Sequence, residues 1–225
     1  TRAAEVDPGT GIKMSLGDNN YQKFTAFHNT GVNELGWSSS FLLGFWQGDG
    51  WRNGMQGQGT TYAFSVGYTP RGGDHEFNFS LIGAGQWHHQ AYYGTQLQDY
   101  LDYGPIQGDD YRKFNALYGD YKGEEFSILR NYYNKPLATF NWDWEISSRV
   151  TLATSLYGSA GRGGGTGLRG RGSYGVSPFR ESYAEYLDDH GEWRNSDTTI
   201  NWNVAVQKNA AGAHVPDSGP FAGMK

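Results

Sequence analysis

The chain contains no cysteine and no long apolar run, and these two absences exclude several kinds of protein. Without cysteine there is no disulfide, no thiolate nucleophile and no cysteine metal ligand, and the compartment cannot be inferred from cysteine. No stretch reaches the roughly 18 apolar residues of a transmembrane helix. The formal net charge of −5 gives no reason to expect nucleic acid as a partner. No charged segment followed by an apolar stretch opens the sequence, so we expect a signal peptide to have been removed or the chain to be internal to a longer polypeptide.

Glycine and aromatic residues are abundant where aliphatic residues are sparse. The chain has 34 glycines and is 16% aromatic, but apolar residues make up only 37%. A thick aliphatic core is difficult to build from this composition. Many aromatic residues with few aliphatic ones are typical of exposed sheet surfaces, aromatic girdles or glycan-binding faces.

Alternation of apolar and polar residues with a period of two is the dominant pattern, and it predicts β-strands. The clearest segments are Thr60–Thr69 and Leu137–Ile146. In the first, one face carries Tyr62, Phe64, Val66 and Tyr68. In the second, one face carries Phe140, Trp142, Trp144 and Ile146, opposite Thr139, Asn141, Asp143 and Glu145. Each strand therefore presents one side to an apolar environment and one to water or polar partners.

Five further segments repeat the pattern less regularly, at Gly11–Gly17, Gln22–Thr30, Trp37–Trp46, His75–Ala84 and Val150–Gly158. Several have the length of about 9–11 residues that a tilted strand needs to cross a membrane. We therefore expect seven strands, with one question left open. Thr199–Gln207 also alternates and is either an eighth strand or an ordered loop.

The links between these segments are sorted by length. Short links follow the second, fourth and sixth strands, at Gly31–Gly36, Pro70–Asp74 and Ser147–Arg149. Long links follow the third, fifth and seventh, at Gln47–Gly59, Gly85–Lys135 and from Ser159 onward. The first link, Asp18–Tyr21, is the exception. Short turns at one end and long loops at the other are typical of outer-membrane barrels, whereas a soluble β-sandwich needs no such sorting.

Several motifs in the long links have a chemical and a structural interpretation. Gln86–Gln90 (QWHHQ) is a ligand-contacting cluster, a metal site or an interfacial aromatic; adjacent histidines in extended chain point apart, which disfavours metal. Gly161–Gly167 (GRGGGTG) opens a glycine-rich stretch in which Gly165, Gly167 and Gly170 satisfy G-x-G-x-x-G, but no helix is expected after it, so we interpret it as a flexible or tightly turned loop. Gln98–Gly104 suits a helical turn, and Asp188–His190 lacks a nucleophile elbow. We therefore predict no catalytic residue, no metal site, no cofactor and no enzyme activity.

Six stretches in order along the chain resemble one family. They are GIKMSLGDNNYQKFT, GWSSSFLLGFWQGDGW, YAFSVGYTP, GAGQWHHQ, NWDWEI and AGRGGGTG. Together they resemble the first barrel strands of TonB-dependent outer-membrane receptors of the Bacteroidota type. The resemblance implies an all-β fold, an antiparallel transmembrane barrel of about 22 strands with long extracellular loops. Residues 1–225 would supply about seven or eight of these strands, without the plug domain, and Thr1–Ala4 looks like the join between plug and barrel.

The resemblance implies a function and a set of partners. Such a receptor, in the outer membrane of a Gram-negative bacterium, binds a nutrient (a metal chelate, oligosaccharide or peptide) and imports it. Its partners are outer-membrane lipid and lipopolysaccharide, the remaining barrel and plug, the TonB complex through the missing N-terminal region, and a candidate surface lipoprotein. From position and chemistry we expect ligand contacts at Trp51, Trp87, His88, Arg130 and Arg162. The alternative is a secreted soluble β-sandwich that binds polysaccharide through exposed aromatics.

Overall fold

The computed structural model describes residues 2–91, 95–166 and 194–211, which form two compact units. The first unit comprises residues 1–48, 57–87 and 132–164, and the second comprises residues 49–56, 88–131 and 165–225. The predicted Asp188–His190 motif lies outside the described residues. The fold is mostly antiparallel β-sheet with few helices, which confirms the all-β prediction.

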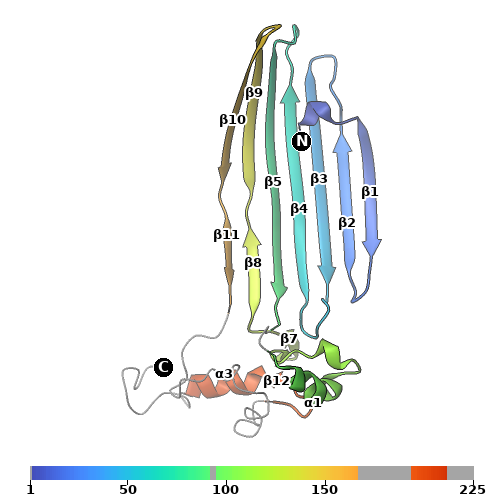
Figure 1. The fold of residues 1–225 in the computed structure, drawn as a ribbon, viewed down its shortest axis with the longest axis vertical. Helices are drawn as coiled ribbons and strands as arrows, with labels where there is room; N and C mark the ends of the chain where they lie inside the picture. Colours follow the sequence, from blue (N-terminus) through green and yellow to red (C-terminus); the bar gives the residue numbers. More distant parts are fainter. Residues whose placement is uncertain (1, 92–94, 167–193, 212–225) are drawn as a thin grey trace, which may run out of the picture. The chain divides into compact units, whose positions relative to one another are not determined.

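A sheet of nine strands builds the first unit (Figure 1). Its strands are β1 (Gly9–Leu16), β2 (Gln22–Asn29), β3 (Trp37–Gly48), β4 (Gly57–Tyr68), β5 (His75–His89), β8 (Arg130–Asn134), β9 (Leu137–Ser147), β10 (Val150–Ser159) and β11 (Arg162–Gly165). Strands β1 to β5 follow one another as neighbours. Beyond β5, the sheet continues with β9 and β10 along one part and with β8 and β11 along the other.

These nine strands follow seven extended paths, as the sequence predicts. Strands β8 and β9 are one path interrupted at residues 135–136, where Pro136 has no N–H to donate to a neighbouring strand. Strands β10 and β11 are another, interrupted at residues 160–161. The seven predicted segments all lie in strands, whose ends differ from the predicted ones by a few residues at most, except at β5, which runs on to His89.

Part of the glycine-rich motif after the seventh strand is not a loop. Residues Arg162–Gly165 form strand β11, so the expectation of a flexible or tightly turned loop is wrong there. The glycines admit close packing, because a methyl group at Gly163 would lie within 2.8 Å of the Tyr132 carbonyl oxygen and one at Gly164 within 2.9 Å of the Tyr132 hydroxyl. Strand glycines at a close approach of another chain segment are a known use of this residue.

Aromatic rings cover strand glycines elsewhere in the sheet as well. A methyl group at Gly83 would overlap the Tyr62 ring, and one at Gly11 would overlap the ring of its cross-strand partner Phe27. The abundance of both residue types therefore has a structural reason. At these two positions a ring covers backbone that has no side chain of its own.

The pairing register places apolar residues of neighbouring strands on a common face. Phe41 pairs with Phe64 between β3 and β4, and Phe79 pairs with Phe140 between β5 and β9. Directly opposed residues of antiparallel strands share a face, and alternate residues return to it. The predicted apolar stripes therefore join across the sheet into one continuous surface.

The second unit has a small core of its own. It contains α1 (Leu97–Gln107), the 3₁₀ turn η2 (Tyr111–Lys113), the helix α3 (Trp202–Ala211) and a three-stranded sheet of β6 (Gly119–Tyr121), β7 (Glu124–Phe126) and β12 (Ile200–Asn201). Leu117, Ile200 and Trp202 form the buried cluster, with Tyr121, Phe126, Ile128 and Leu129 packed against it. The predicted helical turn at Gln98–Gly104 lies within α1. Only the first part of the segment left open at Thr199–Gln207 is a strand, and the rest is α3.

Three amides tie the second unit together. The buried Asn115 donates its side-chain NH₂ to the carbonyl of Asn53 (2.7 Å), and its backbone N–H donates to Gln107 Oε1 (2.9 Å). Asn53 Nδ2 donates to the same Gln107 oxygen (3.2 Å). The link after β3, the end of α1 and the segment before β6 are thereby joined, so the long links are folded structure. Among the described residues, no helix is long and apolar enough to cross a membrane.

Candidate functional site

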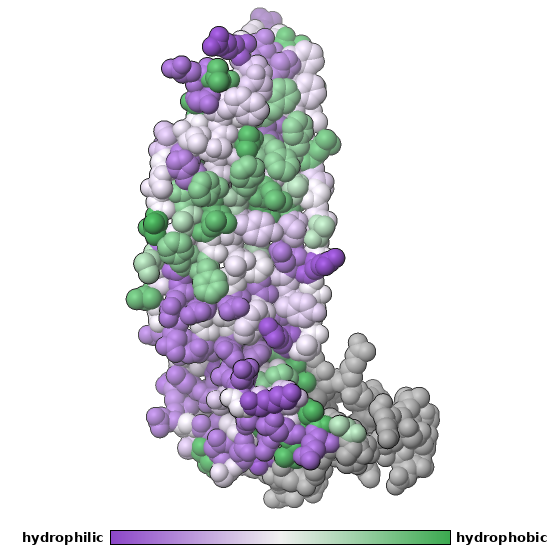
Figure 2. Space-filling model, turned by 180° about the vertical axis from the view of Figure 1, so that it is seen from behind, coloured by the Kyte–Doolittle hydropathy of each residue, from purple (hydrophilic) through white to green (hydrophobic). Residues whose placement is uncertain are grey.

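One face of the large sheet is apolar and exposed. Phe64 is 45% exposed, Leu43 58% and Leu156 63%, although all three are large apolar residues in strands. Figure 2 shows hydrophobic side chains gathered in a band across this face. A contiguous exposed apolar surface of this kind marks contact with a membrane or another protein.

Aromatic rings cluster on the same face near the turns that end β4 and β9. Trp142 and Trp144 are stacked with ring centroids 6.2 Å apart, and Phe77 lies 6.3 Å from Trp142. His75 joins them, with its ring 5.4 Å from Trp144 and its Nδ1 3.3 Å from the indole nitrogen of Trp142. Such rings with a polar edge suit the boundary between hydrocarbon and water.

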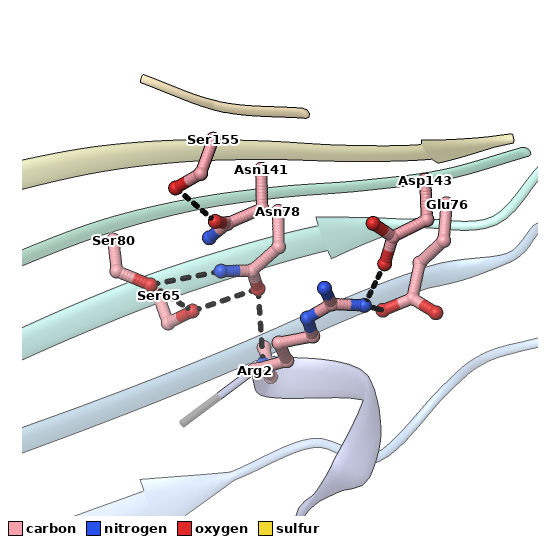
Figure 3. Close-up of polar contacts among 9 residues, drawn as sticks. Arg2, Ser65, Glu76, Asn78, Ser80, Asn141, Asp143 and Ser155 are labelled. Carbon is pink, nitrogen blue, oxygen red and sulfur yellow. Dashed lines mark hydrogen bonds and ion pairs between the residues drawn. The ribbon is translucent and has the colours of Figure 1, made fainter. Parts of the chain in front are cut away.

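The opposite face carries a hydrogen-bonded network of small polar side chains (Figure 3). Asn78 is only 2% exposed and lies at its centre. Its Oδ1 accepts from the Ser65 hydroxyl (3.0 Å), and its Nδ2 donates to Ser80 Oγ (2.9 Å). Further along the face, the Ser155 hydroxyl donates to Asn141 Oδ1 (2.8 Å). Because buried amides require partners, these bonds fix side chains that project from four strands, β4, β5, β9 and β10.

The N-terminal residues lie on this polar face. The backbone N–H of Ala3 donates to Asn78 Oδ1 (3.1 Å), and Ala3 is fully buried. The Arg2 guanidinium pairs with Asp143 and lies 3.3 Å from Glu76 Oε1 (Figure 3). Its hydrogen bond with Asp143 raises the pKa of Arg2, so this side chain is charged at every physiological pH. The 3₁₀ turn η1 (Ala3–Glu5) is the element that positions these groups.

A hollow of about 480 Å³ opens beside this segment. Its walls include Arg2, Glu5, Ser40, Ser65, Thr139 and Asn141. The volume is that of a small-molecule pocket. Hydroxyl and amide groups share the lining with the apolar Ala63, Phe64 and Ile82 and with one cation and one carboxylate, so the hollow can form hydrogen bonds with a polar group and also contact an apolar one. We see no arrangement of nucleophile and base in it.

The five residues predicted to contact a ligand are divided between the two units. Trp51, His88 and Arg130 lie in the second unit, and Trp87 and Arg162 lie in the first. Trp87 and His88 are half-buried near the end of β5, whereas Arg130 and Arg162 are exposed at the starts of β8 and β11. His88 and Arg130 both lie within electrostatic range of His89. The structure does not gather the five into a single site within either unit.

Trp51 is surrounded by charged side chains whose proximity was not evident from the sequence. The residue is 52% exposed, and two cations lie over its ring, with Arg112 Cζ 5.9 Å and Lys113 Nζ 5.4 Å from the ring centroid. Asp110 fixes the Arg112 guanidinium through two hydrogen bonds of 2.8 Å. Cations above an aromatic ring are attracted to its face, so this indole is held in place while remaining accessible.

A partly buried carboxylate distinguishes the second unit. Glu125 Oε1 lies 4.0 Å from Nδ1 of the buried His89. Burial raises the pKa of Glu125, and the nearby Asp49 raises it further, while a hydrogen bond from the Gln56 backbone opposes them. The pair therefore does not behave as a strong ion pair, because burial favours the protonated, uncharged form of this carboxyl.

The raised pKa of Glu125 predicts that the free energy of unfolding depends on pH, and removal of this carboxyl would abolish its contribution. The folded chain keeps this proton where the unfolded chain has released it, so the free energy of unfolding falls as pH rises from about 4.5 through the raised pKa. We expect Glu125→Gln to gain stability relative to the wild type as pH rises across this window, measured from denaturation midpoints. Glu124→Gln, at the exposed neighbour, is the control. A Glu125→Gln difference that is constant with pH would contradict the assignment.

Comparison with known proteins found no relative of this chain. Family models, curated proteins and solved structures were each searched, and none matches the chain. Among the described residues, no group of three or more His, Asp or Glu side chains is placed to hold a metal ion. What the chain can do is therefore inferred from its two contrasting faces and from the segment on the polar one.

The sequence did not identify the polar network or the ion pairs of Arg2. Asp143 was placed on a polar strand face, and Arg2 was part of the expected join to a plug, but nothing connected the two. One signal was available: Glu76 and Asp143 occupy the polar faces of segments that can be neighbours in a sheet. Two carboxylates directly opposite one another on adjacent strands repel, and a nearby cation offsets that repulsion.

Proposed function

We propose that the large sheet is part of the wall of a TonB-dependent outer-membrane receptor, with its apolar face toward lipid and its polar face toward the barrel interior. The observation that carries this proposal is the register-matched contrast between the faces. Adjacent residues on one strand differ in surroundings: Phe64 is exposed among apolar side chains, whereas Ser65 is buried in the polar network. Alternation of apolar-out and polar-in residues is the pattern of transmembrane barrels.

The edges of the sheet support this assignment. Within the described residues, β1 pairs only with β2, and β10 and β11 are the outermost strands on the other side. In lipid, each unsatisfied backbone N–H or C=O would cost several kcal/mol, so both edges require further strands. We infer that strands outside this sheet complete a closed wall of the receptor.

The folded long links support the ligand-binding part of the proposal. They follow β3, β5 and β11, and they contain a buried core and the accessible Trp51. We propose that they form the extracellular side, where a scarce nutrient such as a metal chelate, oligosaccharide or peptide is bound. Trp51, Trp87, His88, Arg130 and Arg162 remain its candidate contacts.

The proposed location defines the partners. The apolar face contacts outer-membrane lipid and lipopolysaccharide. The rest of the barrel closes the wall, and a plug domain fills its interior. The TonB complex supplies the energy for import. A surface lipoprotein is a further candidate partner at the long links. In this proposal the chain binds and imports and carries out no catalysis.

A soluble sandwich that binds polysaccharide fits the observed exposure less well. In a sandwich the apolar faces of two sheets pack against each other and are buried. Phe64 is 45% exposed, and Tyr68, Trp142 and Trp144 are each half-buried. Aromatic residues that could stack on sugar rings are present, but they belong to a continuous apolar face.

Cysteine labelling of adjacent residues tests the proposal. The chain has no cysteine, so Ala63→Cys and Phe64→Cys each introduce a unique thiol on opposite faces of β4. In outer membranes that contain the intact receptor, Phe64→Cys should react with a maleimide dissolved in the bilayer and not with a membrane-impermeant one. Ala63→Cys should not react with the bilayer reagent. Equal reaction of Phe64→Cys with the impermeant reagent would overturn the proposal.

A further inference from the structure

The strongest unassigned feature is the way in which residues Arg2–Glu5 are fastened to the polar face. Several contacts are made over a few residues. Arg2 reaches two carboxylates, the N–H of Ala3 reaches a buried amide, and η1 packs against β3 and β4. A single 3₁₀ turn has little stability of its own, so these contacts determine its position.

The two carboxylates that bind Arg2 are direct cross-strand partners. Glu76 on β5 pairs with Asp143 on β9, so both project from the same face. Like charges directly opposite one another destabilise a sheet. The Arg2 guanidinium lies against both groups and offsets their repulsion. The repulsion within the pair therefore favours binding of a cation, and the guanidinium of Arg2 is that cation.

The backbone of Arg2–Glu5 lies close to β3 and β4 at a place where both strands carry small residues. A methyl group at Gly67 would come within 2.5 Å of Ser38 Oγ and 3.5 Å of the backbone nitrogen of Ala4. Gly67 and Ser38 are both buried in the docked arrangement, as is Ala3. Glycine at residue 67 thus allows the backbone of Ala4 to approach β4 closely, and a larger side chain there would prevent this.

The strength of this attachment is modest. The side chains of Arg2, Glu76 and Asp143 are 30%, 31% and 22% exposed, so water and salt screen their attraction. Partly exposed ion pairs contribute little to stability, and the buried apolar surface is limited to one small residue. Such an attachment orders the segment while remaining easy to release.

We propose that Arg2–Glu5 is a detachable clasp, in which Arg2 occupies the Glu76–Asp143 pair and keeps the neighbouring hollow partly closed. Arg2 and Glu5 form part of the wall of the 480 Å³ hollow, so withdrawal of the clasp widens it. Withdrawal also leaves the two carboxylates facing open solvent. In the proposed receptor, which this inference uses as its setting, a displacement of the N-terminal segment would open a polar path along the barrel wall.

A spin label at residue 5 tests the clasp. Glu5 is exposed, and Glu5→Cys gives a unique thiol in a chain without cysteine. In the intact receptor in detergent or vesicles, the label should be largely immobilised. Arg2→Ala, and separately Glu76→Gln with Asp143→Asn, should convert most of that signal to a mobile component. Raising the NaCl concentration from 0.05 to about 0.5 M should move the wild type in the same direction, because salt screens exposed charges.

Two further variants separate the clasp from a general loss of structure. Glu145→Gln removes a carboxylate next along the same face of β9 and should leave the label immobilised. Exchange of the charges, with Arg2→Asp and Asp143→Arg together, should restore the immobilised component that Arg2→Asp alone loses. An unchanged spectrum in Arg2→Ala, or no recovery in the exchanged pair, would overturn the proposal. The spectrum reports attachment alone, whereas failure of the proposed function would appear in the cysteine labelling at Phe64.

Discussion

An arginine at Leu43 should destabilise the membrane-inserted protein by about 2–4 kcal/mol, the cost of a charge on the lipid face of a barrel near mid-membrane. Leu43 lies on the apolar face of β3 and is 58% exposed, and its cross-strand partners Ala26 and Tyr62 carry no charge that could pair with an arginine. The measurement is the free energy of unfolding in lipid vesicles, from the fraction folded against denaturant concentration.

The adjacent residue provides a matched control. Leu42 pairs with Ala63 on the opposite face, so Leu42→Arg places the same side chain on the polar side of the same strand. We expect this variant to lose much less stability than Leu43→Arg. If the two cost the same, or if Leu42→Arg costs more, the apolar face does not contact lipid.

Gly119→Ala should disrupt the second unit and lower its stability by about 3 kcal/mol, at the upper end of the usual cost of overpacking. Strand β6 pairs in parallel with β12, with Gly119 opposite Ile200. A methyl group at residue 119 would overlap the carbonyl of Ile200, which belongs to the backbone and cannot rotate away. Separation of the strands would expose Ile200, a member of the buried cluster.

Hydrogen exchange measures this effect locally. The Ile200 N–H donates to the Tyr118 carbonyl (2.8 Å) and should lose most of its protection in Gly119→Ala. Gly165→Ala is the control, because a methyl group there would lie 3.6 Å from its nearest neighbour, an ordinary contact. If protection at Ile200 survives in Gly119→Ala, the close approach of the two strands is wrong.

Period-two patterning predicted the sheet because each strand obeys it independently. Segments such as Thr60–Thr69 and Leu137–Ile146 carry their face assignment in their own sequence, and they correspond to strands β4 and β9 of the large sheet. Strands β8 and β11 lacked this signal. Strand β8 is only five residues long, and β11 consists of Arg162 and three glycines and is a strand because it pairs with β8.

The alternation at Thr199–Gln207 leaves a strand and an ordered loop as alternatives, and most of the segment is a helix instead. Ile200, Trp202, Val204 and Val206 alternate like a strand, but only Ile200–Asn201 pairs with a neighbour. Strand pairing has to be available at each position, and the partner β6 is only three residues long. The helix α3 satisfies its backbone internally once that partner ends.

The polar site was less predictable because it depends on register between strands distant in sequence. The bonds of Asn78 to Ser65 and to the N–H of Ala3 span 13 and 75 residues. No single segment contains that information. Sequence reasoning instead selected conspicuous residues, Trp51 and Arg130 among them, and their common involvement in ligand binding remains a prediction.

The interruption at Pro136 divides the edge of the sheet beyond β5 into two sections, β9–β10 and β8–β11, whose strand pairing can open separately. Strand β9 begins at Leu137 opposite Ser159, the last residue of β10, so both paths break at the same level. There the Ser159 hydroxyl donates to the Pro136 carbonyl (2.7 Å), in place of a backbone bond. Loosening of the short β8–β11 section, next to the long links, would therefore stop at this boundary and leave the ladder between β9 and β10 intact.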